Sequence, residues 1–256
     1  MILSVDIGNS NLTLGVYQGE TLIHRWRLST VPLATADDLG ISFRMLLTSN
    51  GVALDSINAV VYASVVPPLV APFERMCNRY LGVAPLQVKP GTRTGIDIKY
   101  QDPREVGPDR IANAVAAQSR HKGPLVVVDF GTATTFDVIS KAGQYAGGAI
   151  LPGVGISTEA LFAKAARLPR IDLSQPREAI GKNTVSSMRS GIVYGYAGAV
   201  DALIERIEKE SGPLERTIAT GGWARAIAPE CKRVDEVDPD LTLEGLRIIL
   251  VRNQLI

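Results

Sequence analysis

The first thirty residues alternate between short apolar runs and polar turns. Two turns, Gly8-Asn9-Ser10-Asn11 and Gln18-Gly19-Glu20, separate three apolar segments: Ile2–Ile7, Leu12–Tyr17 and Thr21–Leu28. Apolar runs of this length, bounded by glycine and asparagine, predict strands joined by tight turns. The N-terminus is therefore predicted to form an antiparallel meander of three strands.

Helical and strand patterns alternate after the meander. Helices are expected over Thr35–Ser49 and Pro68–Leu81, and a β-branched strand is expected over Ile57–Val66. Acidic residues open the first helix and prolines open the second, which is typical of helix starts. Three strands followed by alternating helix and strand predict a mixed sheet covered by helices.

One uncharged stretch, residues 56–73, tests whether the chain crosses a membrane. Its 18 residues approach the shortest length of a membrane-spanning helix. Pro67, Pro68 and Pro72 fall in its second half and would break such a helix. A buried strand followed by a proline-started helix explains the stretch, and no membrane partner is expected.

The pattern of the N-terminus returns in the second half of the chain. Strands are expected over Leu125–Asp129 and Thr134–Ser140, with a polar turn between them. One offset of 123 residues places Asp129 on Asp6 and Gly131 on Gly8. The shared order of elements favours a duplication, with halves at residues 1–120 and 121–256. Later segments predict a strand over Thr217–Thr220 and helices over Val154–Ala166, Thr184–Glu210 and Leu241–Val251.

The composition excludes several classes of function. The 256 residues carry 27 basic and 26 acidic side chains, so a formal charge of +1 leaves no broad basic footprint for nucleic acid. The two histidines and two cysteines are isolated in the sequence, so neither a zinc site nor a Ser-His-Asp triad is expected. Lone cysteines, and a start that lacks the basic residues of a signal peptide, favour the reducing cytoplasm.

Two Asp-x-Gly turns are candidates for chemistry. Asp6 and Asp129 each end an expected strand, and each is followed by a glycine and by polar residues. Such turns direct backbone N–H groups at phosphate oxygens, while the carboxylate can hold Mg²⁺ directly or through water. Each turn alone is equally typical of an ordinary hairpin. Two of them in register favour two clamps on a nucleotide held between duplicated halves.

Two further segments stand at expected helix starts. Asp109, in Gly107-Pro108-Asp109-Arg110, is either a helix-capping carboxylate or a general base that takes the proton from an attacking hydroxyl. Arg110 offers a bidentate donor to a substrate carboxylate. Gly221 and Gly222 follow an expected strand, where either a flat ligand such as adenine approaches the backbone or the chain makes a strand–helix turn.

Together these segments resemble the type III pantothenate kinases, a family within the acetate and sugar kinase/Hsp70/actin superfamily. The resemblance covers essentially the whole chain and depends on the joint order and spacing of short motifs. These are Asp6-Ile-Gly-Asn-Ser-Asn11, Gly107-Pro-Asp-Arg110, Val128-Asp-Phe-Gly-Thr-Ala-Thr-Thr135, Gly147-Gly-Ala-Ile-Leu-Pro-Gly153, Gly181-Lys-Asn-Thr184 and Thr220-Gly-Gly222. The resemblance implies an α/β fold of two duplicated actin-like (ribonuclease H-like) halves, with the ATP cleft between them.

The resemblance also implies an activity and the residues that perform it. Family members transfer the γ-phosphate of ATP to the hydroxyl of pantothenate, which is the first step of coenzyme A synthesis. By position, Asp109 is implied as the proton acceptor and Asp129 as the ligand of a monovalent cation, K⁺ or NH₄⁺, that acts alongside Mg²⁺. Thr132 is implied to contact ATP together with the first phosphate loop, which consists of Asp6, Ile7, Gly8, Asn9, Ser10, Asn11, Leu12 and Thr13. Pantothenate is implied to contact Tyr100, Gly107, Pro108, Asp109, Arg110 and Thr184, near the interface of a cytoplasmic homodimer.

The chain departs from the family pattern at two positions. Ser10 replaces the usual threonine and keeps its hydroxyl, and Pro108 replaces the common alanine at a helix start, where proline is tolerated. The residues by themselves lead to an ATP-dependent phosphotransferase and leave its acceptor open. A nonenzymatic ATP-binding regulator on the same fold and a kinase for another small acid or sugar are the alternatives.

Overall fold

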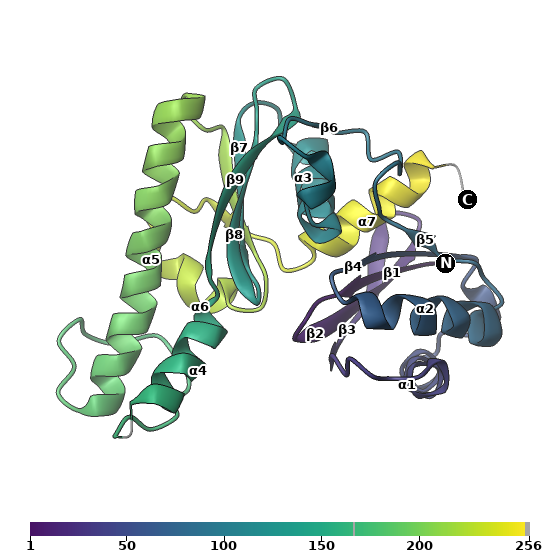
Figure 1. Cartoon of the computed structure of the whole chain (residues 1–256), viewed down its shortest axis with the longest axis horizontal. Helices are drawn as coiled ribbons and strands as arrows, with labels where there is room; N and C mark the ends of the chain where they lie inside the picture. The colour runs from purple at the N-terminus through teal and green to yellow at the C-terminus, as the bar shows by residue number, and fades with distance from the viewer. Residues whose placement is uncertain (166, 254–256) are drawn as a thin grey trace. The chain divides into compact units, whose positions relative to one another are not determined.

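The structure, a computed structural model, describes residues 1–165 and 167–253 and consists of two compact units (Figure 1). Of the described residues, the first unit contains 1–96, 101–116 and 241–253, and the second contains 97–100, 117–165 and 167–240. Helix α3 (Pro108–Arg120) begins in the first unit and ends in the second.

The first unit is built on one mixed sheet. Its strands follow the order β3-β2-β1-β4-β5. Strands β1 to β3 form the predicted antiparallel meander, β4 runs parallel to β1, and β5 runs parallel to β4. Their bounds are Ile2–Ile7 (β1), Asn11–Gln18 (β2), Thr21–Ser29 (β3), Ala59–Ser64 (β4) and Leu86–Gln87 (β5).

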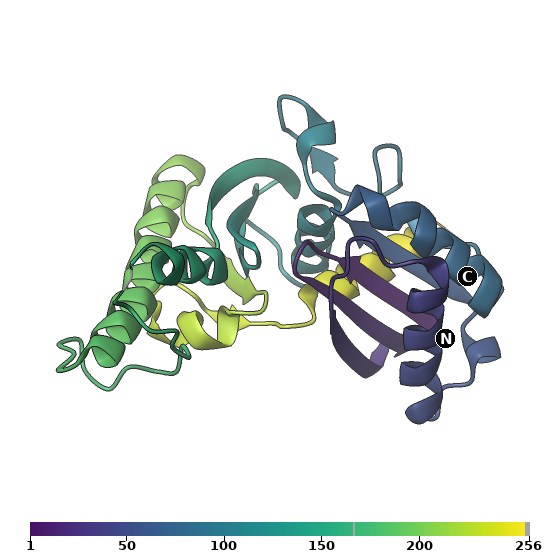
Figure 2. The same ribbon diagram turned by 60° about the horizontal axis from the view of Figure 1, so that its bottom comes forward.

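Helices cover both faces of this sheet. Helices α1 (Ala36–Ser49) and α2 (Pro67–Met76) lie side by side on one face, and α7 (Leu241–Arg252) packs on β1, β2 and β4 from the other (Figures 1 and 2). Alternate residues of β1, from Leu3 to Ile7, point into the core under α1 and α2. Because side chains alternate along a strand, Asp6 points to the opposite face.

The second unit is built on a mixed sheet with the order β11-β10-β7-β8-β9-β6. Helices α4 (Val154–Lys164), α5 (Thr184–Ser211) and α6 (Ala224–Ile227) pack on the face that carries Val126, Val128 and Phe130, which leaves Asp129 on the opposite face. The strand bounds are Asp97–Ile98 (β6), Leu125–Phe130 (β7), Ala133–Ile139 (β8), Gln144–Pro152 (β9), Arg216–Thr220 (β10) and Glu236–Val237 (β11).

The two sheets repeat one topology. Strands β7 and β9 begin and end 123 residues after β1 and β3, and β8 begins 122 residues after β2. The second and third strands of each meander share an irregularity of register at matching positions, Val16/Tyr17 and Val138/Ile139. A parallel strand, β4 or β10, follows the first strand on its other side. The duplication predicted from the sequence is therefore repeated in the strand order, and the α/β class with a mixed sheet in each half is confirmed.

The compact units differ from the halves expected at residues 1–120 and 121–256, mainly because of the last helix. Helix α7 belongs to the first unit, because its buried residues Leu241, Leu243 and Leu246 cover the face of the first sheet that bears Asp6. The other boundary falls within α3, near Ala116. Chain order alone therefore does not reproduce the division into compact units.

Several elements differ from the sequence expectations in detail. The helix expected over Pro68–Leu81 ends as α2 at Met76 and continues as a π-helical turn, Cys77–Leu81. Strand β9 is absent from the expectations because Gly147 and Gly148 lower the strand propensity of its segment. Residue 166, the expected end of the helix that starts at Val154, lies outside the described residues.

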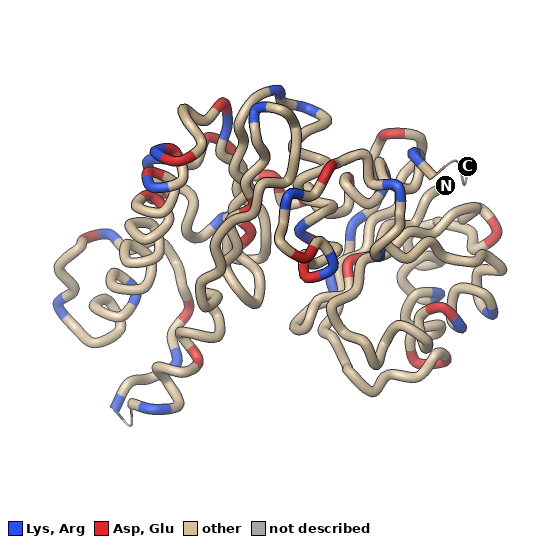
Figure 3. Tube along the Cα trace, turned by 45° about the horizontal axis from the view of Figure 1, so that its top comes forward, with Lys and Arg blue, Asp and Glu red and all other residues tan. Residues whose placement is uncertain are grey.

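Within residues 1–165 and 167–253, no helix is both long and apolar enough to cross a membrane. The uncharged stretch over residues 56–73 instead contains β4 and the start of α2, as predicted. Basic and acidic residues are interspersed along both units (Figure 3), in keeping with the formal charge of +1.

Candidate active site

The first Asp-x-Gly turn joins β1 to β2. Asp6 pairs with Thr13 in the strand register, and the next pair, Ile7 with Leu12, closes the ladder before the turn. Ile7 and Leu12 are buried in the core. They can therefore offer a ligand only backbone groups, whereas Asp6 and Thr13 are partly exposed.

Thr30, just beyond the end of β3, fastens this turn. Its Oγ1 donates a hydrogen bond to the Gly8 carbonyl at 2.6 Å, and its N–H donates to the Ser10 carbonyl at 3.1 Å. Within the turn, the Gly8 N–H donates to the Asn11 carbonyl at 3.0 Å. Asn9 and Ser10 are exposed at the tip, where an anionic ligand can reach them. The shape of the turn is therefore stabilised by Thr30, a residue outside the turn.

The second Asp-x-Gly turn joins β7 to β8 and is walled by glycines. Asp129 pairs with Thr135 in the register, as Asp6 pairs with Thr13. A Cβ built on Gly221, which has a φ of +91°, would overlap the Asp129 carboxylate and lie 2.6 Å from the Phe130 carbonyl carbon. The positive φ and the close approach of the Gly221 backbone to Asp129 and Phe130 therefore both require glycine at this position.

Thr132, at the exposed tip of the second turn, is backed by Gly153 at the start of α4. A Cβ on Gly153 would overlap the Thr132 carbonyl oxygen and lie 2.8 Å from the Gly131 carbonyl oxygen. The φ of Gly153 is −71°, which any residue adopts, so close approach of the two backbones is what requires glycine here.

Asp109 lies in the first turn of α3. The Ile111 N–H donates to the Gly107 carbonyl at 3.1 Å, so Gly107 stands at the helix start and Asp109 stands inside the turn. Its Oδ1 atom is buried without a hydrogen-bond partner among the described residues. A Cβ on Gly107 would overlap that same oxygen. A capping carboxylate needs only one oxygen to accept from a helix N–H, so the unpartnered Oδ1 is compatible with a second role for Asp109.

Burial sets the protonation behaviour of Asp109. Loss of solvent raises the pKa of its carboxyl above the ordinary value, because the charged form is poorly solvated. The backbone N–H groups of Arg110 and Asp109, and the Arg110 guanidinium, act in the opposite direction. Burial is the larger effect, so the pKa moves towards neutrality, as suits a group that accepts a proton in a reaction.

Two neighbours of Asp109 complete this segment. Arg110 is only 8% exposed, and it places a guanidinium beside the Asp109 carboxylate. Pro108 is the first residue of α3, where its missing N–H costs no helical hydrogen bond. The predicted Gly107–Arg110 segment is therefore assembled around one buried carboxylate oxygen.

Tyr100 stands in the second unit, two residues after the short strand β6. Its ring contacts that of Tyr145 edge-on, with centroids 6.3 Å apart and an interplanar angle of 61°. Its Cε2 atom lies 3.7 Å from where a Cβ on Gly147 would stand. Tyr100 is thus seated on β9, at the glycine pair of the fourth sequence motif.

Thr184 is the first residue of α5 and is exposed. The preceding residue, Asn183, caps the helix: its side chain accepts from the Ser186 N–H, while the Ser186 side chain accepts from the Asn183 N–H. This N-terminal end of α5 and strand β6 lie at opposite ends of the second unit (Figures 1 and 2). The structure therefore does not bring Thr184 and Tyr100 together within one unit.

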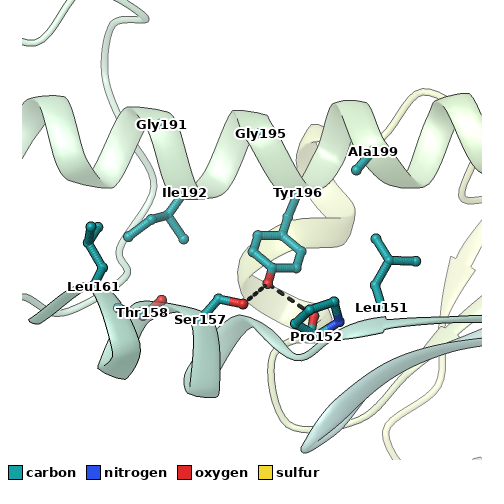
Figure 4. A pocket seen from close by; sticks show the side chains of 10 residues that line it. All are labelled: Leu151, Pro152, Ser157, Thr158, Leu161, Gly191, Ile192, Gly195, Tyr196 and Ala199. Carbon is teal, nitrogen blue, oxygen red and sulfur yellow. Dashed lines mark hydrogen bonds between the residues drawn. The ribbon is translucent and has the colours of Figure 1, made fainter. Parts of the chain in front are cut away.

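An apolar groove of about 360 Å³ lies between α4, α5 and the end of β9. Tyr196 reaches from α5 towards α4, and its hydroxyl lies within hydrogen-bond distance of Ser157 Oγ, at 2.6 Å, and of the Pro152 carbonyl, at 3.0 Å (Figure 4). The remaining walls are mainly aliphatic or glycine: Leu151, Thr158, Leu161, Gly191, Ile192, Gly195 and Ala199. The sequence motifs do not predict this groove.

Comparison with known proteins decides the family. The family model of the type III pantothenate kinases matches residues 2–206. A type III pantothenate kinase from Geobacter sulfurreducens is 51% identical over 254 residues, which span 99% of this chain and 100% of the relative. The chain belongs to the type III pantothenate kinase family. Another member, from Myxococcus xanthus, is 50% identical over 253 residues and is covered to 99%, as is this chain.

Solved structures share the fold of this type III pantothenate kinase family member. The activator of 2-hydroxyisocaproyl-CoA dehydratase from Clostridium difficile, solved with bound ADPNP, has a TM-score of 0.57 at 12% identity and covers 99% of this chain and 95% of its own. A ROK hexokinase from Thermus thermophilus has a TM-score of 0.51 at 13% identity, with 97% of each chain covered. At these identities the likeness concerns the fold alone, a pair of mixed sheets with helices.

The sequence motifs miss residues that support the family's site. Thr30 and Gly153, which back the two turns, occupy the same place in the repeat, and the offset of 123 residues that relates Asp6 to Asp129 relates them as well. Extending that offset beyond the turns would have found them. Tyr145 has no such signal, because its contact with Tyr100 depends on how β6 pairs with β9.

Proposed function

We propose that Asp109 is the general base in the ATP-dependent phosphorylation of pantothenate to 4′-phosphopantothenate, the first step of coenzyme A biosynthesis. The observation that carries this assignment is the buried, unpartnered Oδ1 of Asp109 in the first turn of α3. Asp109 takes the proton of the pantothenate hydroxyl as that oxygen bonds to the γ-phosphorus. The bond from the γ-phosphorus to the β-bridging oxygen breaks, and ADP leaves with its electron pair.

The two Asp-x-Gly turns are proposed to hold the phosphates of ATP. The first would contribute its backbone from Asp6 to Thr13, and the second would contribute Thr132. Thr30 and Gly153 support this role, because each holds one turn in a fixed shape. Positioning of this kind supplies most of the catalysis in phosphoryl transfer, which needs little covalent help from the protein.

The site is proposed to use Mg²⁺ and a monovalent cation, K⁺ or NH₄⁺. Both are hard cations that prefer carboxylate, carbonyl and hydroxyl oxygens, and the two turns offer such donors. Asp129 suits the monovalent cation, because its partly exposed carboxylate stands at the end of β7, next to the hydroxyl and carbonyl oxygens of the second turn. Asp6 fits Mg²⁺ held directly or through water, with ATP phosphates as further ligands. Bound there, the cations would neutralise charge on the transferring phosphoryl group.

The acceptor is proposed to bind at the Gly107–Arg110 segment, with Tyr100 and Thr184 lining its pocket. Arg110 would pair with the pantothenate carboxylate, since a guanidinium forms bidentate hydrogen bonds with that group. Gly107 lacks a side chain that would cover Asp109 Oδ1. Pro108 holds the helix entry, so this departure from the common family residue is compatible with Asp109 in its place.

We further propose that the protein works as a cytoplasmic homodimer. Strand β6, which shortly precedes Tyr100, and the N-terminal end of α5, which begins at Thr184, lie at opposite ends of the second unit, so a pocket that contains both residues calls for a second copy of the chain. Exposed apolar side chains on and next to α4 and α5, which are Ile156, Leu161, Ile180 and Val185, suit burial against another surface. Cys77 and Cys231 are free thiols, as is usual in a reducing compartment.

One experiment tests the main assignment. ADP release is measured with pantothenate, with sugars and with other small hydroxy acids as acceptors, each in the presence and absence of K⁺. We expect turnover with pantothenate and activation by K⁺. Turnover with a sugar and none with pantothenate would favour the alternative of a kinase for a different acceptor, and no acceptor-dependent ADP release would favour the regulator.

A further inference from the structure

The second sheet holds a buried tyrosine–carboxylate pair, Tyr145 and Asp137, of which only the Tyr145 ring has been described so far. The Tyr145 hydroxyl donates to Asp137 Oδ1 at 2.8 Å, and both residues are 0% exposed. The Thr135 hydroxyl reaches Asp137 Oδ2 at a longer distance of 3.4 Å. A carboxylate taken out of water is costly unless hydrogen bonds compensate it, so this pair requires a reason.

The fold by itself does not require the pair. In the first sheet, Gly15 takes the place of Asp137 and Leu22 takes the place of Tyr145, because the two meanders share one register. The space around Gly15 is filled by apolar atoms: a Cβ there would lie 2.9 Å from Leu22 Cδ1 and from Leu243 Cδ1. One strand topology therefore folds with an apolar contact at these positions in the first unit and with the polar pair at the matching positions in the second.

The pair lies on the face of the sheet that carries Asp129. Thr135 pairs with Asp129, and Asp137 follows Thr135 by two residues, so all three side chains share one face. Gly148 is the direct partner of Asp137, and a Cβ on Gly148 would overlap the Phe136 carbonyl oxygen. With no side chain at Gly148, the Tyr145 ring occupies the space beside the carboxylate.

Tyr145 connects this pair to Tyr100. The Lys99 N–H donates to the Tyr145 carbonyl at 2.8 Å, which places Tyr100 next to strand β9. The two tyrosine rings contact each other edge to face. Because Gly147 has no side chain, the Tyr100 ring packs directly on the backbone there. Strand β6, which delivers Tyr100, has no counterpart in the first sheet. Among the described residues, strand β6, Gly147 and the Asp137–Tyr145 pair thus occur together in the second sheet, and the matching positions of the first sheet hold none of them.

We infer that Asp137 and Tyr145 are positioning residues for the acceptor. The hydrogen bond to Asp137 holds the Tyr145 ring in one orientation, and the Tyr145 ring holds Tyr100 as a wall of the pantothenate pocket. This inference rests on the proposed function, in which Tyr100 contacts pantothenate. Neither Asp137 nor Tyr145 touches the reacting atoms, so their effect falls on acceptor affinity and not on the chemical step.

The test is Tyr145→Phe, which removes the hydroxyl and keeps the ring. We expect the KM for pantothenate to rise about threefold to tenfold, the range for loss of one hydrogen bond. The KM for ATP and kcat should stay within about twofold of the wild type, because the phosphate turns are untouched. Isothermal titration calorimetry should give the same loss of pantothenate affinity. Asp137→Asn keeps an acceptor oxygen for the Tyr145 hydroxyl, so its KM for pantothenate should stay near the wild-type value. Asp137→Ala removes that acceptor, so its KM for pantothenate should rise as in Tyr145→Phe.

Tyr62→Phe is the matched control. Its hydroxyl donates to Glu74 Oε1 at 2.8 Å, and Tyr62 is also 0% exposed, but it belongs to the first unit. It should lose comparable thermal stability with no change in the pantothenate KM. The inference is overturned if Tyr145→Phe behaves like Tyr62→Phe, or if Tyr100→Ala leaves the pantothenate KM unchanged. Wild-type protein that does not phosphorylate pantothenate would overturn the proposed function first, and the inference with it.

Discussion

The two meanders share one register but hold their Asp-x-Gly turns by different means. In the first, the Thr30 side chain and N–H bond to the turn carbonyls. At the matching place in the second, Gly153 has no side chain, and its backbone closes directly on Thr132 and Gly131. Duplication has therefore preserved the ladder, which depends on backbone geometry, while the residue that supports each turn has diverged.

The interior positions of the meanders show the same division. Gly15 and Leu22 form an apolar contact where Asp137 and Tyr145 form a hydrogen bond. Apolar alternation decides which face of a strand is buried, and both solutions satisfy it. The chemistry at a buried position is consequently free to change after duplication, so long as every polar group finds a partner.

The largest expected effect comes from removing the proposed base, which only the first unit supplies. Asp109→Asn removes the base from the first unit and leaves both turns intact. Turnover should fall by about 10²–10⁴-fold, the usual contribution of a positioned general base, with ATP affinity retained. Steady-state kinetics and nucleotide titration measure the two quantities. Near-normal turnover would reduce Asp109 to a residue of the α3 first turn.

The raised pKa of Asp109 also predicts how the free energy of unfolding and the activity change with pH. Because the folded protein holds the Asp109 proton more tightly than the unfolded chain does, this group destabilises the fold as pH rises from the ordinary carboxyl pKa towards the raised value. At neutral pH the Asn variant should therefore unfold with an equal or higher free energy. In the wild type, kcat/KM should fall as pH drops through the raised pKa, because the base becomes protonated.

A smaller effect would sharpen the contrast between Thr30 and Gly153. Gly153→Ala places a methyl group against the Thr132 and Gly131 carbonyls and should cost about 2–4 kcal/mol of unfolding free energy. Gly198→Ala is the matched control, because an added Cβ on this exposed face of α5 meets nothing within 4 Å. It should gain up to about 1 kcal/mol from helix propensity. Equal stabilities for the two variants would contradict the close approach at Gly153.

The smallest effect concerns the support of the first turn. Thr30→Val removes the hydrogen bond to the Gly8 carbonyl and keeps the side-chain shape and the backbone contact to Ser10. The free energy of unfolding should fall by about 1 kcal/mol, and the KM for ATP should rise about twofold to fivefold because the turn becomes less rigid. Thr48→Val, on the exposed surface of α1, is the control and should leave the KM for ATP unchanged. If the KM for ATP were unchanged in Thr30→Val, the shape of the turn would not depend on the Thr30 hydroxyl.

Much of the fold could be predicted because its signals are local. Alternation and turn residues predicted β1, β2 and β3, and the Asp-x-Gly repeat located β7 and β8. Strand β9 escaped prediction because glycines at Gly147 and Gly148 resemble a turn in sequence, although neighbouring strands hold them in a ladder. Its matching place in the duplication was the only available signal.

The candidate site was predictable in its motifs and not in its supports. The Asp6, Asp109 and Asp129 motifs are short contiguous segments, so their spacing is visible in the sequence. The burial of Asp109 Oδ1 and the closure of Gly221 on Asp129 involve atoms that packing brings together. No periodicity reports such contacts.

The sequence alone determined the α/β class, the duplication, the family resemblance and the motifs that belong to it, because these depend on the order of residues along the chain. Only the tertiary structure decided that α7 returns to the first sheet, that Asp109 is a buried carboxyl with a raised pKa, and that Tyr145 joins Asp137 to Tyr100. Desolvation and contact are properties of three-dimensional packing. They arise between residues distant in sequence, and the order of residues does not state them.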